Sequence, residues 1–119
     1  MKGVQQVKQY HAKNILNVAL AGHSGAGKTS LAESMLYLAG AADRLGKISD
    51  GNTICDFDPE EVKRKASVST AVAPVEWKNK KLNFIDTPGL FDFEGGLWEG
   101  VRAADTVMIA VSGKNGVSV

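Results

Sequence analysis

The stretch GHSGAGKT, residues 22–29, is the most informative part of the chain because it satisfies the pattern G-x-x-x-x-G-K-[ST] in the context that this pattern requires. A compact apolar run, residues 15–21, comes directly before it and is expected to form a strand buried on both faces. Directly after it, Leu31, Met35 and Leu38 recur at helical spacing. Strand, glycine-rich loop and helix in this order predict a phosphate-binding loop.

The chemistry of such a loop assigns roles to individual residues. Glycines let backbone N–H groups turn inward around phosphate oxygens, and the positive end of the following helix dipole faces the same place. Lys28 is expected to reach the β- and γ-phosphates of a nucleotide, and the Thr29 hydroxyl to coordinate Mg²⁺. The competing interpretation is a glycine-rich turn with a solvated lysine. The candidate nucleotide-binding residues of this segment are His23, Ser24, Gly25, Ala26, Gly27, Lys28, Thr29 and Ser30.

A second candidate phosphate motif, DTPG at residues 86–89, follows an apolar run at residues 82–85. Ligands of open α/β sheets bind at the carboxyl ends of the strands, where this acid would lie. Asp86 is expected to hold Mg²⁺, through a water because magnesium loses its hydration reluctantly. Gly89 is expected to offer its backbone N–H to the γ-phosphate and so to sense that group. Alone, the same four residues are ordinary turn chemistry.

The rest of the chain supplies a sheet and a second helix. Lys78-Asn79-Lys80 is suited to the turn of an antiparallel hairpin, and Pro74 favours an edge strand there. After the first helix we expect a long surface segment at residues 43–66, then two hairpin strands at residues 68–77 and 82–85. A short helix at residues 97–104 and a final strand at residues 107–111 are expected to follow. This order predicts an α/β P-loop NTPase sandwich whose sheet is mostly parallel, with one antiparallel hairpin.

Composition limits the class of protein further. The chain has 119 residues, of which 44% are hydrophobic and 23% charged, which fits one domain. A net charge of +1 gives no broad field for DNA or a membrane surface, so neither is expected as a partner. Cys55 is the only cysteine, which excludes an intrachain disulfide. The run at residues 15–21 is too short to span a membrane, and a cytoplasmic location is expected.

Together these residues resemble the GTP-binding domain of translation factors, most closely that of bacterial elongation factor G and its elongation-factor-G-like relatives. The phosphate loop, with histidine in second place, and the DTPG motif with a DF pair at residues 92–93 are similar to the family's two motifs. Between them, a DF pair at residues 56–57 and RKASV at residues 64–68 align with the family's Asp-aromatic pair and its Arg-Gly-Ile-Thr-Ile segment. The resemblance runs from about Asn14 to the C-terminus.

The resemblance implies an activity and a set of ligands. It implies that the full-length parent binds GTP/GDP and Mg²⁺ and hydrolyses GTP to GDP and phosphate in a ribosome-linked step. Lys28 and Gly89 would then act in catalysis, and Thr29, Ser67 and Asp86 would hold the metal. Ser67 stands where the family has a first-switch threonine, and serine keeps the hydroxyl. The competing interpretation of Ser67 is a polar residue at a strand edge.

Three positions depart from the family pattern. At one of them, Gly25 replaces an acidic residue that is common in the family's phosphate loop. Leu90 stands where the family typically has a histidine that orients the attacking water, and leucine has neither donor nor acceptor. The alternative function is therefore a GTP-gated ribosome-binding switch with weak or no hydrolysis. Lys65 stands where the family usually has glycine, so a different local backbone path is possible there.

The C-terminal part contains no Asn-Lys-x-Asp sequence, the motif whose aspartate recognises guanine in this family. Lys114-Asn115-Gly116 lies before the place where the family's motif is expected. We therefore expect an arm at residues 1–13 and, at residues 14–119, the N-terminal part of a truncated GTP-binding domain. Such a domain would lack strands on one side of its sheet and expose apolar surface there, and alone it is expected to be inactive. An ATPase or kinase is a further candidate, because it would share the phosphate loop but not the DTPG motif.

Overall fold

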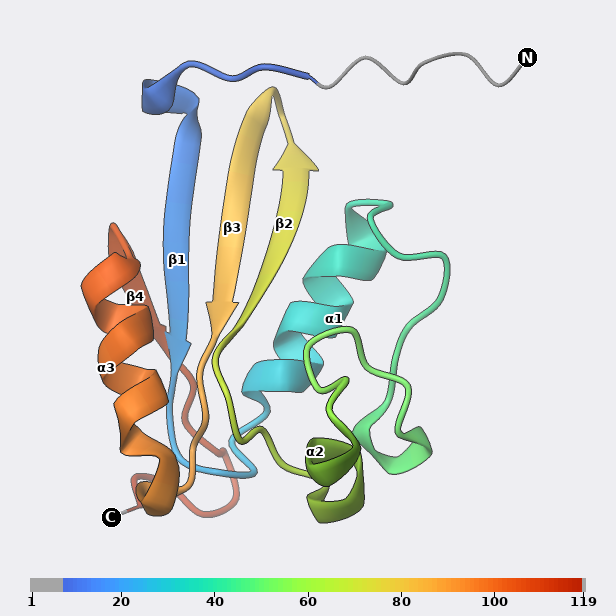
Figure 1. The fold of residues 1–119 in the computed structure, drawn as a ribbon, viewed down its shortest axis with the longest axis vertical. Coiled ribbons are helices and arrows are strands. Elements are labelled where there is room, and N and C mark those ends of the chain that lie inside the picture. The colour runs from blue at the N-terminus through green and yellow to red at the C-terminus, as the bar shows by residue number, and fades with distance from the viewer. Residues whose placement is uncertain (1–7, 119) are drawn as a thin grey trace.

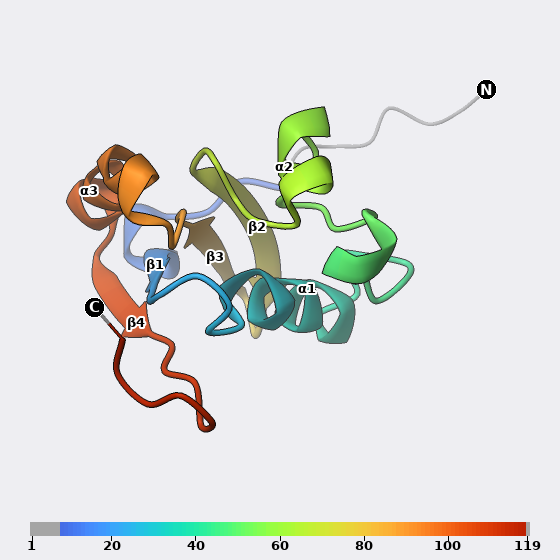
Figure 2. The ribbon, with the colours of Figure 1, turned by 90° about the horizontal axis from the view of Figure 1, so that it is seen from below.

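The computed structural model describes residues 8–118 and consists of one four-stranded sheet between two helices (Figure 1). The strands lie in the order β2-β3-β1-β4. Seen from below, the sheet separates α1 on one face from α3 on the other (Figure 2). The elements are β1 Ile15–Ala21, α1 Lys28–Leu38, α2 Pro59–Arg64, β2 Ala71–Trp77, β3 Lys80–Asp86, α3 Glu94–Ala103 and β4 Thr106–Ile109, with short 3-10 turns at Ala12–Asn14, Ile48–Asp50 and Phe91–Phe93.

The central strand β1 is parallel to both of its neighbours, β3 and β4. The expected burial on both faces holds only near its carboxyl end, where Ala19 and Leu20 are buried, while its other residues are half-buried. In the register, Leu20 lies beside Asp86 and Ala21 beside Ile109. The loop that follows β1 therefore lies at the same edge of the sheet as the end of β3, as the two motifs predict.

The antiparallel hairpin of β2 and β3 is confirmed, with a turn shorter than expected. Trp77 pairs with Lys80, which leaves only Lys78 and Asn79 in the turn. Both have positive φ, at 47° and 62°, as a two-residue turn matched to the twist of the strands requires. Pro74 lies on β2, an edge strand, so its missing N–H costs no bond to a further strand.

The two faces of the sheet are packed differently. The face under α1 carries the main apolar cluster, formed by Leu20, Ala32, Leu36, Cys55, Ala73, Val75 and Phe84. On the other face, two glycines of α3 allow a close approach to the end of β3. A carbon added at Gly100 would collide with the Thr87 side chain, and one added at Gly96 would lie 2.8 Å from Cδ of Pro88. Helix α3 is thus in direct contact with the DTPG motif.

Strand β4 forms the other edge of the sheet and exposes apolar side chains. Val107 and Met108 are each 39% exposed, and Ile109 is 71% exposed. The strand ends at Ile109, before Val111, which was expected to belong to it. Within residues 8–118, no helix combines the length and the apolar character needed to cross a membrane.

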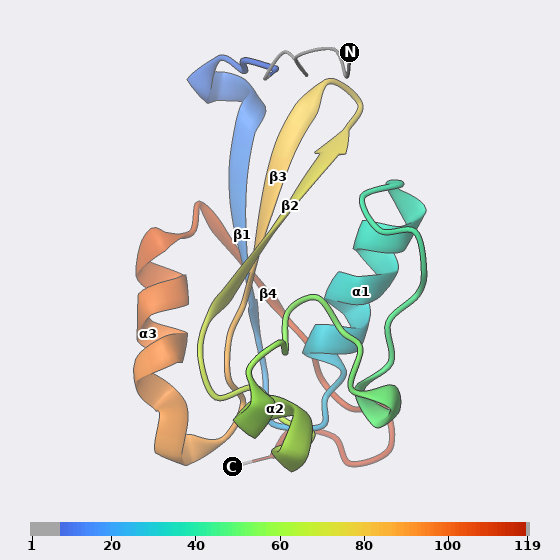
Figure 3. The same cartoon turned by 45° about the vertical axis from the view of Figure 1, so that its right-hand side comes forward.

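The segment at residues 43–66 differs from the expected irregular surface segment. It contains α2, in front of the sheet in Figure 3, and it buries Thr53, Cys55 and Asp56. The helix begins there because the Asp58 carboxylate accepts the Glu60 N–H at 2.8 Å and because proline follows at the first helical position. The expected arm at residues 1–13 lies partly outside the described residues, and its last two residues enter the first 3-10 turn.

Candidate functional site

The loop between β1 and α1 is shaped by left-handed glycines. Gly25 has φ of 81° and Gly27, the N-cap of α1, has φ of 99°, conformations that other residues adopt only with strain. The loop bounds a cavity of about 140 Å³. Most of the predicted binding residues line this cavity, which is enclosed by Ser24, Gly25, Gly27, Lys28, Thr29, Ser30, Ile48, Lys65, Ala66, Ser67 and Gly89.

The Lys28 side chain folds back over the loop. Its Nζ donates to the carbonyl oxygens of Gly22 at 2.7 Å and His23 at 3.0 Å. The side chain is buried, and burial lowers its pKa, against the opposing charges of Asp86 and Asp56. The structure therefore places a cation at the loop, with carboxylates near enough to favour its charged form.

Gly89 of the DTPG motif lies directly on the loop. The Ser24 N–H donates to the Gly89 carbonyl oxygen at 3.1 Å. A carbon added at Gly89 would lie 2.5 Å from both Lys28 Nζ and the Ser24 nitrogen, so only glycine fits here. The two motifs meet as expected, and in this structure the Gly89 carbonyl oxygen is the group bonded to the loop.

Close contacts between side-chain oxygens join the three predicted metal ligands. The Thr29 hydroxyl donates to Asp86 Oδ2 at 2.6 Å and lies 3.2 Å from Ser67 Oγ. Ser67 in turn donates to Asp56 Oδ1 at 2.6 Å. Residues that are 57 and 38 positions apart in the sequence thus meet at the start of α1. Asp56 was not among the predicted site residues.

This cluster fits a hard divalent cation. Its donors are all oxygens, and one oxygen of each carboxylate, Asp86 Oδ1 and Asp56 Oδ2, is buried without a hydrogen-bond partner. Burial raises the pKa of Asp86 to about 6, although the Thr29 hydrogen bond lowers it, and the charge of Asp56 raises it further. Within residues 8–118 no group of three or more His, Cys, Asp or Glu side chains could hold a metal ion. A cation here needs further oxygen ligands, such as water or phosphate.

Two more buried acids surround the cluster and were missed by the sequence analysis. Glu33 of α1 is 1% exposed and Glu61 of α2 is 3% exposed. Burial, and then the neighbouring Asp56, raises the pKa of Glu61 to about 7. Burial also raises the pKa of the Cys55 thiol. Glu33 could have been predicted from its spacing. It follows Thr29 by four residues on a predicted helix, so the two side chains share one face of that helix.

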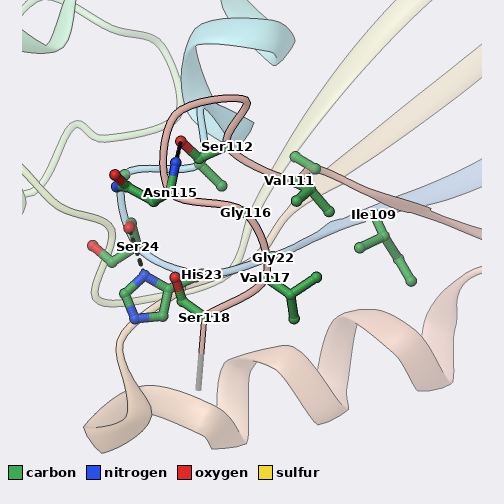
Figure 4. Close-up of a pocket in the computed structure, with 13 residues that line it drawn as sticks. Gly22, His23, Ser24, Ile109, Val111, Ser112, Asn115, Gly116, Val117 and Ser118 are labelled. Atoms are coloured by element: carbon green, nitrogen blue, oxygen red, sulfur yellow. Dashed lines mark hydrogen bonds between the residues drawn. The ribbon is translucent and has the colours of Figure 1, made fainter.

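Three predicted binding residues, His23, Ala26 and Asp86, do not line the 140 Å³ cavity. His23 and Ala26 border a neighbouring one, which Ser24 and Gly25 also line. This second cavity, of about 170 Å³, lies between the loop and the turn that follows β4 (Figure 4). The His23 ring is exposed, and its Nδ1 lies 2.8 Å from the Ser24 carbonyl oxygen. On the far side of this cavity, the Asn115 N–H donates to Ser112 Oγ at 3.2 Å.

The position of Leu90 can also be described. It is half-buried and lines a shallow cavity of about 500 Å³ with Phe91, Asp92 and Glu94. Phe91 is 84% exposed. Lys65, where the family usually has glycine, has φ of 54° at the end of α2. Glycine adopts that left-handed conformation without strain, whereas lysine does not.

A mostly parallel sheet in which β1 leads through a glycine-rich loop into a helix, with an aspartate at the end of the neighbouring strand β3, defines a P-loop nucleotide-binding fold. Within that class the chain belongs to the family described as "Elongation factor Tu GTP binding domain", which matches residues 13–119. The chain is accordingly a GTP-binding domain of the translation-factor GTPases.

Similar proteins and structures agree with this family. The chain is 43% identical over 103 residues to an "Elongation factor G-like protein" of Mycobacterium tuberculosis, and 40% identical over 97 residues to one of Synechocystis. These alignments cover 87% and 82% of this chain and 14% of each relative. A crystal structure of a Thermus thermophilus protein matches with a TM-score of 0.86 at 41% identity, over 88% of this chain and 16% of that one. A bacterial selenocysteine-specific elongation factor matches with a TM-score of 0.66 at 26% identity, over 87% and 16%.

Proposed function

We propose that this chain binds a magnesium-bound guanine nucleotide in the cavity beside the phosphate loop, and that the full-length protein hydrolyses GTP to GDP and phosphate in a ribosome-linked step. The observation that carries the proposal is the 2.6 Å contact between Thr29 and Asp86, together with the buried Lys28, whose ammonium interacts with the charge of Asp86. It brings a hydroxyl, a carboxylate and an ammonium from two motifs to one place, which is the set of groups that a magnesium triphosphate requires.

The residues of the site would divide the work as follows. The amides of residues 24–30 and the N-terminus of α1 bind phosphate oxygens, and Lys28 neutralises charge on the β- and γ-phosphates. Thr29, Ser67 and Asp86 hold Mg²⁺, which would neutralise charge that develops during phosphoryl transfer. Lys28 and Gly89 act on the γ-phosphate as water attacks it in line. Catalysis thus rests on positioning and charge.

Phosphate binding requires a local rearrangement of the DTPG motif. The Ser24 amide and the Lys28 ammonium now face Gly89 and the loop carbonyls. We infer that a γ-phosphate takes these donors over, and that the Gly89 peptide then turns its N–H toward the phosphate. This exchange would make the motif sensitive to the presence of the γ-phosphate.

The guanine base and the ribosome enter the proposal through the family. The relatives are elongation factor G-like proteins, and the chain spans only 14% of their length. Their resemblance supports guanine as the base, the ribosome as the partner of the full-length protein, and the cytoplasm as its location. The alternative of a switch with little turnover depends on Leu90 alone, and no relative described above supports it.

The proposal is tested by phosphate release from the full-length protein, with GTP or ATP, and with or without ribosomes. We expect GTP-specific turnover that ribosomes accelerate. Lys28→Ala should weaken triphosphate binding by about 10- to 100-fold, the scale of a charge-assisted hydrogen bond. Lys80→Ala, at an exposed lysine on the distant hairpin, is the matched control. Equal affinity of the Lys28 variant and the wild type would remove the assignment of the phosphate loop.

A further inference from the structure

Glu33 is a buried carboxylate with no role in the site described so far. It lies on α1 four residues after Thr29, so the two side chains emerge from the same face of the helix, one turn apart. Only 1% of Glu33 is exposed. Burying a charged group is unfavourable unless its hydrogen bonds are replaced. The contacts that offset the cost of burying the Glu33 carboxylate therefore indicate its role.

The carboxylate is enclosed by the segment that leads to Asp56. Its Oε1 accepts the Ile54 N–H at 2.5 Å, and its Oε2 has no hydrogen-bond partner among residues 8–118. A carbon added at Gly46 would collide with Oε2 and would lie 3.0 Å from the Asn52 carbonyl oxygen. Gly46 thus lies directly against the carboxylate, and the backbone at Asn52 lies close to Gly46. Glycine at position 46 is what allows this approach.

These contacts complete a ring that begins and ends on α1. Thr29 contacts Ser67, and Ser67 donates to Asp56. Asp56 follows Ile54 by two residues, and the Ile54 amide is bonded to Glu33. The chain between residues 46 and 67 is therefore fixed to one helix at two points, one at the hydroxyl cluster and one at Glu33.

We propose that Glu33 is a positioning residue that holds the Asn52–Asp56 segment on the phosphate-loop helix, so that Asp56 and Ser67 are presented to the cation bound beside Thr29. The proposal rests on the proposed function for the identity of that cation. Glu33 touches neither nucleotide nor metal and acts through the Ile54 amide. A residue that only filled space in the core would need no acceptor at this point.

Two variants of similar size separate the acceptor from the volume. Glu33→Gln keeps an oxygen that accepts the Ile54 N–H, whereas Glu33→Met removes it. Ile54→Pro removes the same hydrogen bond from the donor side, which keeps a test available if the methionine variant does not fold. Glu99→Met, at an exposed acid of α3, is the control for the change of side chain.

The first measurement is hydrogen exchange of the peptide covering residues 53–57 in the nucleotide-free, full-length protein. We expect exchange to be about 10- to 100-fold faster in Glu33→Met and in Ile54→Pro, because a buried hydrogen bond is lost. Glu33→Gln and Glu99→Met should stay close to the wild type. Unchanged exchange in both Glu33→Met and Ile54→Pro, or equal acceleration in Glu33→Gln and Glu33→Met, overturns the proposal.

The second measurement is the affinity for a non-hydrolysable GTP analogue, with Mg²⁺ and with EDTA. In Glu33→Met the affinity measured with Mg²⁺ should fall by about 5- to 30-fold, which corresponds to about 1–2 kcal/mol of binding free energy. The affinity measured in EDTA should change little. An equal loss under both conditions would show a merely structural role and overturn the proposal. If the wild type binds no nucleotide, the proposed function fails, while hydrogen exchange still decides whether Glu33 holds the segment.

Discussion

Replacing Asp86 by asparagine should change how the stability of the protein depends on pH. Burial raises the pKa of this carboxyl from its ordinary value of 3.8 to about 6. The folded protein therefore keeps this proton to about pH 6, whereas the unfolded chain releases it near pH 4. The wild type consequently loses stability as the pH rises through this window, because folding takes up a proton there.

The magnitude follows from the same values. A tenfold change in an ionisation constant corresponds to about 1.4 kcal/mol, so an ionised Asp86 costs about 3 kcal/mol of stability at pH 8. Asparagine carries no charge and still accepts the Thr29 hydroxyl through its amide oxygen. The difference in unfolding free energy, variant minus wild type, should therefore increase by about 2 kcal/mol between pH 4 and pH 7, since part of the full effect is already present at pH 4. Any constant effect of the new amide group cancels in this change.

The assay is chemical denaturation at a series of pH values, with EDTA present, followed by the fluorescence of Trp77 and Trp98. The same variant should lose the effect of Mg²⁺ on nucleotide affinity, because the amide cannot replace a charged ligand. A flat difference between variant and wild type from pH 4 to pH 7 would show that Asp86 is not a buried, destabilised carboxylate. A cation site beside Thr29 would then have no electrostatic basis.

Two further substitutions test the loop and the turnover. Gly89→Ala should weaken triphosphate binding by at least about 10-fold, since the added carbon would lie 2.5 Å from Lys28 Nζ, and equilibrium titration with a fluorescent GTP analogue measures this. Equal affinities would mean that Gly89 moves away without cost. Leu90→His should raise ribosome-stimulated turnover by about 10²-fold or more at nearly constant affinity, the usual effect of a water-positioning group. An unchanged rate in single-turnover assays would show that leucine does not limit hydrolysis.

The parts of the fold that could be predicted depend on local signals. The strand, loop and helix around residues 22–29 are encoded in one continuous stretch, and the hairpin turn is marked by the polar residues at positions 78–80. Helix α2 was missed because six residues are too few to show an apolar period. Asp58 followed by Pro59 was nevertheless a helix-start signal of the ordinary kind.

The site was only partly predictable, because several of its contacts join distant residues. Lys28, Thr29 and Asp86 belong to motifs with defined spacing, and they were expected to converge. Asp56 was noted only as half of an aligned DF pair, to which no role in the site was given, and Glu33 belongs to no motif. Their roles depend on which acids turn inward when residues 46–67 fold back onto α1, and sequence order does not determine that.

The glycines at positions 96 and 100 have a mechanical consequence. They bring the backbone of α3 into close contact with Pro88 and Thr87. The Thr70 hydroxyl also donates to the Gly96 carbonyl oxygen at 2.7 Å, which ties the approach to β2 to the same helix. If binding of a γ-phosphate turns the Gly89 peptide, the movement would therefore displace α3 as well. The exposed surface of that helix, where Trp98 is 66% exposed, would move with it and so change its contacts with any bound partner.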